Sequence, residues 1–376
     1  MGGSVYQRAS ALNGSGVPPY HGSMGFRADF TESRWSRRQL LRVALGAGAT
    51  LPLAALLGCT RQGVSVSASP STTTATTAAS SATPTLTATP PPTPSPTPTP
   101  AHTPVPLTIA VLPATLGTGE AMRLEVAMPA WASDAKGTFR FDGKQYALAR
   151  RADGSLWGIV GASLDRSPST SVPLTVEAQT SAGLPIGTGS RNIAIVAVQR
   201  PIDYLQVTEE QGAVLGGDAG PREEAIRQQQ FASFDPVPPR WSGLFLRPTD
   251  GETTTQFGWA RSINNGPVGA GHTGTDLAND TGTPVQLAAA GRVIWAGPMP
   301  IRGNAVVVDH GGGVKSGYHH LSAINVAVGD TVLAAGTVVG LVGSTGFATG
   351  PHLHWEVTVW GTNVDAMTWL TVPFGT

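Results

Sequence analysis

The segment TGPHLHWEV, residues Thr349–Val357, places two histidines one residue apart in an otherwise apolar run that is typical of a β-strand. Residues i and i+2 of a strand point to the same face of the sheet. His352 and His354 are therefore expected to direct two imidazoles into one space. A lone histidine on a strand is usually structural, so this pair needs support from the rest of the sequence.

Strand-like segments continue before and after this pair. Alternating or apolar runs separated by Gly, Asp and Pro are typical of short strands, and they include TPVQLAAAGRVIWAG, NAVVVDHGGGV and DTVLAAGTVVGLVG. We therefore expect an all-β domain over residues 244–376. Six of the eight histidines of the chain fall in this range. This clustering is the strongest functional signal in the sequence.

Two further motifs contain residues that bind metals in proteins. GHTGTDL holds His272 and Asp276, and YHHLS holds His319 and His320. Two neutral imidazoles and a carboxylate form a three-ligand set for a catalytic zinc ion and leave a position for water. Zinc lowers the pKa of that water to about 7. A histidine outside the ligand set can then act as a base or as a donor to developing charge. The three motifs together predict a metal site.

The same motifs carry a resemblance to a known family. HTGTDLANDTGTPVQLAAAGRVIWAG, GNAVVVDHGGGVKSGYHHLSAINVAVGDTV and GSTGFATGPHLHWEV resemble, in unbroken order, the lysostaphin-type or LytM-like zinc endopeptidases of peptidoglycan. The similar stretches cover most of residues 257–369. The resemblance is specific because it includes the spacing of three separate motifs. It implies a LytM-like antiparallel β-sheet catalytic domain.

The resemblance also implies a role for each candidate site residue. His272, Asp276 and His354 would hold one zinc ion. His352 and His320 would be catalytic histidines that do not bind the metal. The resemblance implies this division, since spacing alone does not show which histidine of the HxH pair binds the metal. The enzyme would hydrolyse peptide bonds in the peptide part of peptidoglycan.

The sequence departs from the family pattern at three positions. His319 stands where an aromatic residue is common, and adjacent residues of a strand face opposite sides. Only one of His319 and His320 is therefore expected to enter the site. Lys315 also occupies a position that is often aromatic, and Ala366 follows Asp365 where Pro is usual.

Three further polar residues lie near these motifs. His310, in DHGGG, precedes a glycine turn and is interpreted as a structural histidine that makes hydrogen bonds. Asp309 and Glu356 are candidates for partners behind the metal ligands. Paired charges at the surface are the alternative interpretation of these two carboxylates.

An N-terminal β domain is predicted over residues 106–200. MRLEVAM, residues 122–128, alternates with period two, and Asp142-Gly143 is a hairpin turn signal. VPLTVEA and NIAIVAV add two more strands. Short strands and regular turns favour an immunoglobulin-like β-sandwich. The predicted fold class is thus all-β, a sandwich followed by the catalytic domain.

A connector over residues 201–243 joins the two domains. GPREEAIRQQQF places Pro221 at the start of a run of good helix formers. FDPVPPRW then breaks any helix. We expect a connector with one short helix.

The first residues have the features of an export signal, residues 1–59. Arg37 and Arg38 precede an apolar run that is too short for a membrane-spanning helix, and SRRQLLR resembles the twin-arginine motif. An ordinary secretory signal is the alternative. LLGC resembles a lipobox, which predicts a lipid anchor on Cys59 and an extracytoplasmic protein held at the cell membrane. Met1 and Met24 are both possible starts.

Residues 60–105 are nearly all Ser, Thr, Pro and Ala. Such a segment has little to bury and is expected to form an extended, disordered linker. An extended chain rises about 3.1 Å per residue, which gives a reach of up to ~140 Å. This reach would carry the folded domains from the membrane into the cell wall.

Composition limits the classes of function. Lys and Arg together number 24, as do Asp and Glu, so the formal net charge is zero. This balance argues against nucleic acid as a partner, because phosphate binding needs excess positive charge. The predicted partners are peptidoglycan peptides and the membrane. The alternative function is a non-catalytic wall-binding lipoprotein that regulates other hydrolases, but such relatives typically lose metal ligands. The sequence does not indicate which peptidoglycan bond is cut.

Overall fold

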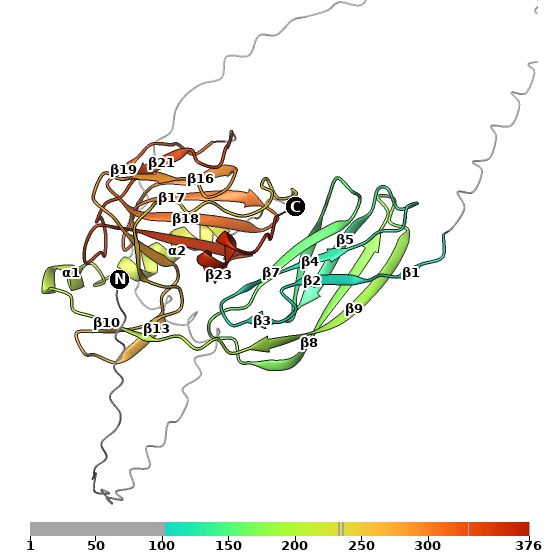
Figure 1. Ribbon diagram of the computed structural model, residues 1–376, viewed down its shortest axis with the longest axis horizontal. Coiled ribbons are helices and arrows are strands. Elements are labelled where there is room, and N and C mark those ends of the chain that lie inside the picture. The colour runs from blue at the N-terminus through green and yellow to red at the C-terminus, as the bar shows by residue number, and fades with distance from the viewer. Residues whose placement is uncertain (1–101, 232–233, 235–236, 330, 376) are drawn as a thin grey trace, which may run out of the picture. The chain divides into compact units, whose positions relative to one another are not determined.

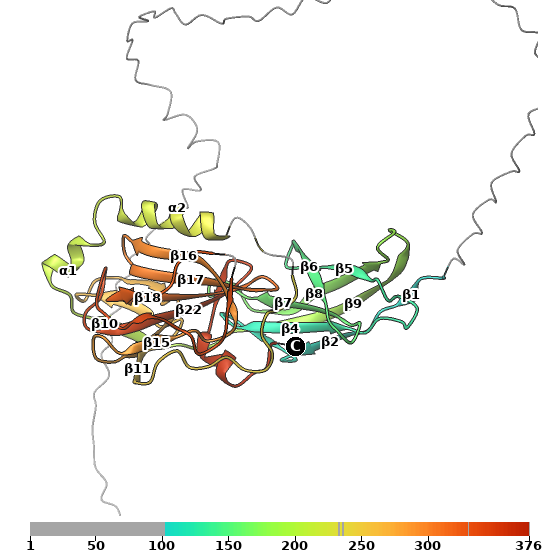
Figure 2. The same cartoon turned by 90° about the horizontal axis from the view of Figure 1, so that it is seen from above.

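The computed structural model describes residues 102–231, 234, 237–329 and 331–375. The described residues form mainly β-strands (Figures 1 and 2), which confirms the predicted all-β class. No helix among them is long and apolar enough to cross a membrane. The predicted signal with Arg37, Arg38 and Cys59, and nearly all of the linker, lie outside the described residues.

The N-terminal strands form a nine-stranded sheet with the order β1-β9-β8-β5-β6-β7-β4-β2, and β3 also pairs with β9. The expected hairpin at Asp142-Gly143 joins β5 to β6, and both turn residues have positive φ, 50° and 76°. The predicted alternation places Met122, Leu124 and Val126 of β4 in a buried core. The immunoglobulin-like topology and the domain limits stay predictions. The strands are β1 (Val105–Pro106), β2 (Ile109–Leu112), β3 (Leu116–Gly117), β4 (Ala121–Val126), β5 (Lys136–Phe141), β6 (Lys144–Arg150), β7 (Leu156–Gly161), β8 (Ser169–Gln179) and β9 (Pro185–Val196).

The C-terminal strands form an eight-stranded sheet with the order β11-β14-β22-β18-β17-β16-β20, and β23 also pairs with β22. Residues 352–357 of the TGPHLHWEV segment form the start of β22, which lies between β14 and β18. Trp355 of β22 and Tyr318 of β18 are completely buried. The strands are β11 (Glu252–Thr255), β14 (Thr275–Ala278), β16 (Gly291–Met299), β17 (Gly303–Gly311), β18 (Val314–Leu321), β20 (Val332–Leu333), β22 (His352–Val359) and β23 (Thr362–Val364).

Two small sheets and three short helices complete the described part. One sheet has the order β15-β21-β19 and the other has the order β10-β12-β13. The bounds are β10 (Ile202–Leu205), β12 (Ala260–Ile263), β13 (Val268–Gly271), β15 (Pro284–Gln286), β19 (Ala323–Ile324), β21 (Val338–Leu341), α1 (Glu209–Ala213), α2 (Ala219–Phe231) and the 3-10 helix η2 (Ala366–Leu370).

The connector takes part in the C-terminal fold. Its strand β10 pairs in parallel with β12. The helix predicted from Pro221 onward is α2, which has Pro221 in its first turn, where a missing N–H costs least. Helix α2 lies along one side of the C-terminal sheet in Figure 2. The connector therefore contains two helices and a strand, which is more structure than the single predicted helix.

Candidate metal centre

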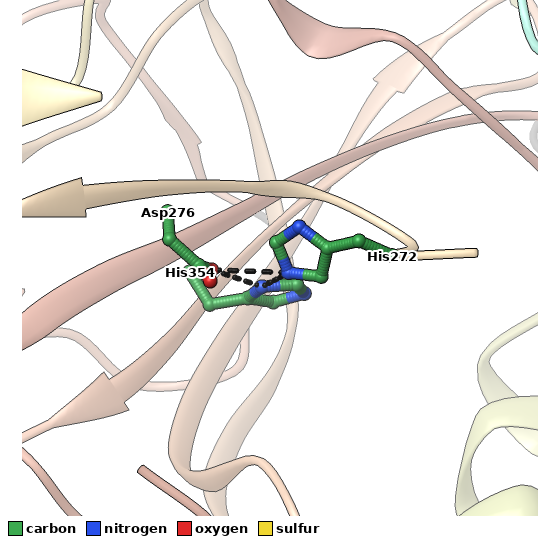
Figure 3. A group of neighbouring side chains, drawn as sticks. All are labelled: His272, Asp276 and His354. Carbon is green, nitrogen blue, oxygen red and sulfur yellow. Dashed lines mark hydrogen bonds and ion pairs between the residues drawn. The ribbon is translucent and has the colours of Figure 1, made fainter. Parts of the chain in front are cut away.

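Strand pairing brings three of the predicted residues together. Asp276 of β14 lies directly opposite His354 of β22 in the antiparallel ladder. His272 stands just before β14, and its ring lies 4.7 Å from that of His354, measured between ring centroids. Figure 3 shows the three side chains converging on one point. The HTGTD and HLH motifs thus meet because their strands are neighbours.

The three facing atoms form a compact triangle. His272 Nε2 is 2.9 Å from His354 Nδ1 and 3.1 Å from Asp276 Oδ1, and the last two atoms are 2.7 Å apart. Nitrogen and oxygen ligands lie about 2.0–2.1 Å from zinc, so the donors of a tetrahedral site are about 3.3 Å apart. Small outward shifts of the side chains would meet this spacing. The donor set therefore fits a zinc ion, and these three residues, here called the metal-binding group, could hold a metal ion in the described part of the chain.

Hydrogen bonds behind the triangle determine which atoms face it. His272 Nδ1–H donates to the carbonyl of Gln256 at 3.2 Å, which leaves the Nε2 lone pair free for a metal. His354 Nε2–H donates to Glu356 Oε1 at 3.1 Å, which leaves Nδ1 as the nitrogen that can bind one. Arg261 Nη2 donates to Asp276 Oδ2 at 2.9 Å, so Oδ1 is the oxygen turned to the triangle. Such partners orient metal ligands.

The electrostatics of the three residues also suit a cation. Burial lowers the pKa of His272 to about 4, so its imidazole is neutral at neutral pH. Burial would raise the pKa of the Asp276 carboxyl, but the neighbouring His272 and His354 imidazoles hold it well below its usual range. Burial opposes ionisation of His354, yet its bonds to Asp276 and Glu356 raise its pKa. A divalent cation at this point would take the place of the proton between His354 and Asp276.

The triangle lies in a cleft of about 540 Å³ whose lining includes both histidines predicted to be catalytic. His320 Nδ1–H donates to the carbonyl of Thr345 at 2.7 Å, and His352 Nδ1–H donates to that of Gly350 at 2.8 Å. Each neutral ring therefore keeps its lone pair on Nε2. The Nε2 of His352 is 3.7 Å from Asp276 Oδ1. The ring centroids of His320 and His352 are 4.8 Å apart.

Both of these histidines are neutral at neutral pH. Burial and the neighbouring His352 ring lower the pKa of His320 well below its usual range. Burial also lowers the pKa of His352, although the carboxylate of Asp276 acts in the opposite direction. Each Nε2 is thus a proton acceptor beside the metal-binding group, which is the property that base catalysis needs.

A β-bulge explains how the YHHLS motif enters the site. Val306 pairs with Tyr318 and Asn304 pairs with Leu321, so His319 and His320 together face the single residue Ala305. His320 has a φ of 61°, which lies in the left-handed region. The simple alternation expected from a regular strand is therefore interrupted at this point.

The bulge gives the two adjacent histidines different positions. His320 lines the cleft. His319 pairs with His354 in the ladder and is buried behind it, with its ring centroid 5.5 Å from that of His354. Its Nε2 lies 3.6 Å from Glu356 Oε2. Of the two, only His320 lines the cleft, although both rings lie near that of His354.

Glu356 is the partner behind His354, and Asp309 is not close to the triangle. Burial would raise the pKa of the Glu356 carboxyl, but Arg227 and Arg302 hold it well below its usual range. Asp309 instead accepts from the backbone N–H of Gly311 and pairs with Arg240 at 3.5 Å. Of the two carboxylates considered from the sequence, only Glu356 contacts a predicted ligand.

His310 makes the contacts of a structural histidine. Its Nδ1–H donates to the carbonyl of Ala290 at 2.9 Å, and its Nε2 is 2.8 Å from the hydroxyl of Ser316. Burial lowers its pKa to about 4. Both ring nitrogens are thus satisfied within the core, away from the metal-binding group.

The arginines of the site were not found from the sequence. Arg261 contacts Asp276, and Arg302 and Arg227 contact Glu356. Arg227 lies in α2 and Arg302 in the turn before β17, so no motif contains them. The only available signal was the position of Glu356 two residues after His354, which places both on one face of the strand.

The C-terminal part is similar to known proteins. Residues 270–366 match the sequence model of peptidase family M23. The DD-carboxypeptidase/endopeptidase Mpg of Neisseria meningitidis is 46% identical over 94 residues, which are 25% of this chain and 21% of that protein. The peptidoglycan DD-endopeptidase ShyA of Vibrio cholerae is 46% identical over 98 residues, 26% of this chain and 23% of that protein. The chain thus spans about a fifth of the length of these relatives.

A solved structure of a putative M23 peptidase from Pseudomonas aeruginosa is also similar. It is 25% identical, and the match covers 69% of this chain and 95% of that one, with a TM-score of 0.49.

Proposed function

We propose that this protein is a zinc-dependent endopeptidase that hydrolyses peptide bonds in peptidoglycan. The observation that carries the proposal is the convergence of His272 Nε2, Asp276 Oδ1 and His354 Nδ1 in a cleft. Two further imidazoles, those of His320 and His352, line the same cleft. One group of residues thus combines a ligand set with proton acceptors.

The chemistry follows from where each residue lies. When bound by the three donors, Zn²⁺ supplies a Lewis acid that polarises a carbonyl and lowers the pKa of water. His352 is the proposed general base, because its Nε2 is unprotonated and lies 3.7 Å from the donor atom of Asp276. The proton of the attacking water moves to this nitrogen.

The ring of His320 lies 4.8 Å from that of His352, between centroids, and has a separate role. Its Nδ1–H bond to Thr345 fixes the ring plane and directs Nε2 into the cleft. When Nε2 takes up a proton released by the attacking water, it can donate that proton to the developing oxyanion or to the leaving amine while the bond to Thr345 persists. The division of labour between His352 and His320 is part of the proposal.

The proposed substrate is the peptide part of peptidoglycan. The two relatives with 46% identity are named for DD-carboxypeptidase and DD-endopeptidase activities. The match to the M23 sequence model covers residues 270–366, which include the three proposed ligands. We therefore propose a peptide bond at a D-amino acid as the first bond to test.

The predicted anchor would hold the enzyme at the cell membrane. A lipid on Cys59 and the Pro-rich linker to residue 105 would place the catalytic domain in the wall at up to ~140 Å from the membrane surface. The predicted division into an N-terminal β domain, connector and peptidase domain is part of the same proposal.

Incubation with purified peptidoglycan tests the function. Full-length mature protein should contain one zinc ion per chain and release peptide fragments that mass spectrometry identifies. A chelator should stop the release, and added zinc should restore it. A protein that binds no zinc and releases no fragment would instead match the alternative of a non-catalytic regulator.

A further inference from the structure

Helix α2 packs on the C-terminal sheet through polar and charged side chains as well as through Ile226, which packs against Met299, Ala305 and Val307. A surface helix of a globular protein normally buries an apolar stripe. The buried positions of α2 are instead Glu223, which is 2% exposed, and Gln230, which is 8% exposed. Arg227 lies between them on the same face, since residues three and four apart are neighbours on a helix. A buried charged face is costly unless each charge finds a partner.

Glu223 finds its partners at the turn before β17. Its Oε2 accepts hydrogen bonds from the backbone N–H groups of Ile301 and Arg302, at 2.5 and 2.9 Å. Its Oε1 pairs with the guanidinium of Arg302. One carboxylate of the connector helix thus fixes both the main chain and the side chain of Arg302.

Arg302 and Arg227 both reach Glu356 of β22. Arg302 donates from Nε to Glu356 Oε1 at 3.0 Å and from Nη2 to the same oxygen at 2.5 Å. Arg227 donates from Nη1 to Glu356 Oε2 at 2.8 Å. The Glu356 residue is only 2% exposed. Its carboxylate is therefore held at both oxygens, from two directions.

Glu356 completes a continuous chain of contacts to the metal-binding group. Its Oε1 accepts the Nε2–H of His354 at 3.1 Å. The far end of α2 is fixed separately, because Lys315 of β18 donates to the carbonyl of Gln230 at 2.5 Å and lies 4.3 Å from the ring centre of Phe234. The helix is thus held at both ends, and its middle contacts the partner of a metal ligand.

We propose that helix α2 supports the zinc-binding geometry of the metal site. Glu223 and Arg227 are positioning residues that hold the Glu356 carboxylate, and through it the imidazole of His354, in the orientation that binds zinc. This inference rests on the proposed function. Partners of metal ligands typically contribute 10–100-fold to metal affinity or activity. The connector would then contribute to metal affinity, beyond its role as a link.

Charge is the reason to assign this role to the helix. Packing alone would need only apolar residues, and apolar replacements of buried ion pairs are often neutral or stabilising. Two negative and two positive charges cancel in this group, which consists of Glu223, Glu356, Arg227 and Arg302. Removing one of them leaves its partner uncompensated beside His354.

The test compares matched substitutions in one helix. Glu223→Gln and Arg227→Gln remove buried charges. Glu224→Gln and Arg222→Gln make the same changes at exposed positions of α2. Zinc affinity is measured on the full mature chain by competition with a chelator, far below the melting temperature. We expect 10–100-fold weaker zinc binding in the two buried variants, and wild-type binding in both controls.

A rescue variant separates positioning from folding. Arg227→Lys keeps a positive donor and should recover part of the lost affinity. If Glu223→Gln and Arg227→Gln melt at lower temperature but bind zinc like the wild type, the helix is only structural and the inference is wrong. If the wild type itself binds no zinc, the proposed function fails and the inference fails with it.

A double substitution covers the case in which a single variant does not fold. Glu223→Gln with Arg302→Gln removes a negative and a positive charge together, so no lone charge stays buried. When residues act through one chain of contacts, the effects of their substitutions do not add. We expect the double variant to bind zinc no more weakly than Arg302→Gln alone. Additive losses would show that Glu223 does not act through Arg302, which overturns the proposed chain.

Discussion

Asp276 and His354 face each other across two paired strands, with Oδ1 of the carboxylate 2.7 Å from Nδ1 of the imidazole. Each is also held from behind, Asp276 by Arg261 and His354 by Glu356. The backbone ladder sets the separation of the two residues, and the partners behind them set which atoms point inward. The pair is thus prepared to bind a cation without large movements.

The two histidines of the HLH motif should respond differently to substitution. His354→Ala removes a proposed ligand, so both zinc content and peptidoglycan cleavage should fall sharply. His352→Ala should keep zinc and lose turnover by roughly 10²–10⁴, because only proton transfer is removed. The measurement is zinc stoichiometry beside fragment release. Loss of metal in His352→Ala with retention in His354→Ala would reverse the assignment.

The YHHLS pair gives a second contrast. His320→Asn should lose most turnover and retain zinc, while His319→Asn should retain zinc and most turnover. Asn is used because His320 has positive φ, which Asn tolerates better than other replacements. Turnover and zinc content are measured for both. Inactivity of His319→Asn alone would show that the bulge does not place His320 as proposed.

Gly274 lies between His272 and Asp276 and has no room for a side chain. A Cβ atom at this position would lie 2.8 Å from Cε1 and 2.9 Å from Nε2 of His354, and 2.6 Å from the carbonyl oxygen of Trp355. Gly274→Ala should therefore displace the imidazole and weaken zinc binding by about 10-fold or more.

The control for this change is Gly329→Ala, since Gly329 is exposed and a Cβ there would meet no atom within 4 Å. Both zinc affinities are measured by competition with a chelator. Equal zinc affinity in wild type and Gly274→Ala would contradict the steric argument.

His310 should make the fold sensitive to acid. Its pKa is about 4 in the folded state and about 6.5 in an unfolded chain. Between these pH values the unfolded state binds a proton that the folded state does not, so the free energy of unfolding falls as pH drops from 6.5 to 4. One pKa unit corresponds to 1.36 kcal/mol, so the full loss is about 3 kcal/mol.

Urea unfolding of the wild type and His310→Gln across this pH range tests the effect. The glutamine amide can donate and accept but does not titrate, so its stability should fall less with acid. The comparison isolates His310 from the other buried histidines, because they are present in both proteins. Parallel pH curves would assign the acid sensitivity to those other groups.

Much of the C-terminal fold was predictable because its signals are local. The alternation through His352 and His354 predicts a strand with both side chains on one face, and in β22 both line the same cleft. Asp142-Gly143 predicts a hairpin because few other residues adopt positive φ in succession. The HTGTD motif predicts a pair of ligands. The pairing of β14 with β22 joins segments far apart in the sequence, and only the family resemblance indicated that they meet.

The bulge and the charged helix were not predictable, for two different reasons. His319 and His320 read as regular strand residues, and only the pairing with Ala305 shows that one is inserted. The polar residues of REEAIRQQQ in α2 indicate a solvent-exposed helix. Glu223 is buried and Arg227 is partly buried because Arg302 and Glu356 contact them, and those partners come from distant parts of the chain.

The parallel pairing of β10 with β12 has a consequence for any shortened form of this protein. A fragment beginning at Leu244, the limit suggested by the sequence, would lack β10 and leave one side of β12 without hydrogen-bond partners. Open strand edges recruit other chains, so this fragment should aggregate where one beginning at Pro201 stays monodisperse in light scattering. Arg261 lies in β12 and pairs with Asp276. A proteolytic cut in the connector that releases β10 would therefore change both the solubility of the protein and the surroundings of Asp276.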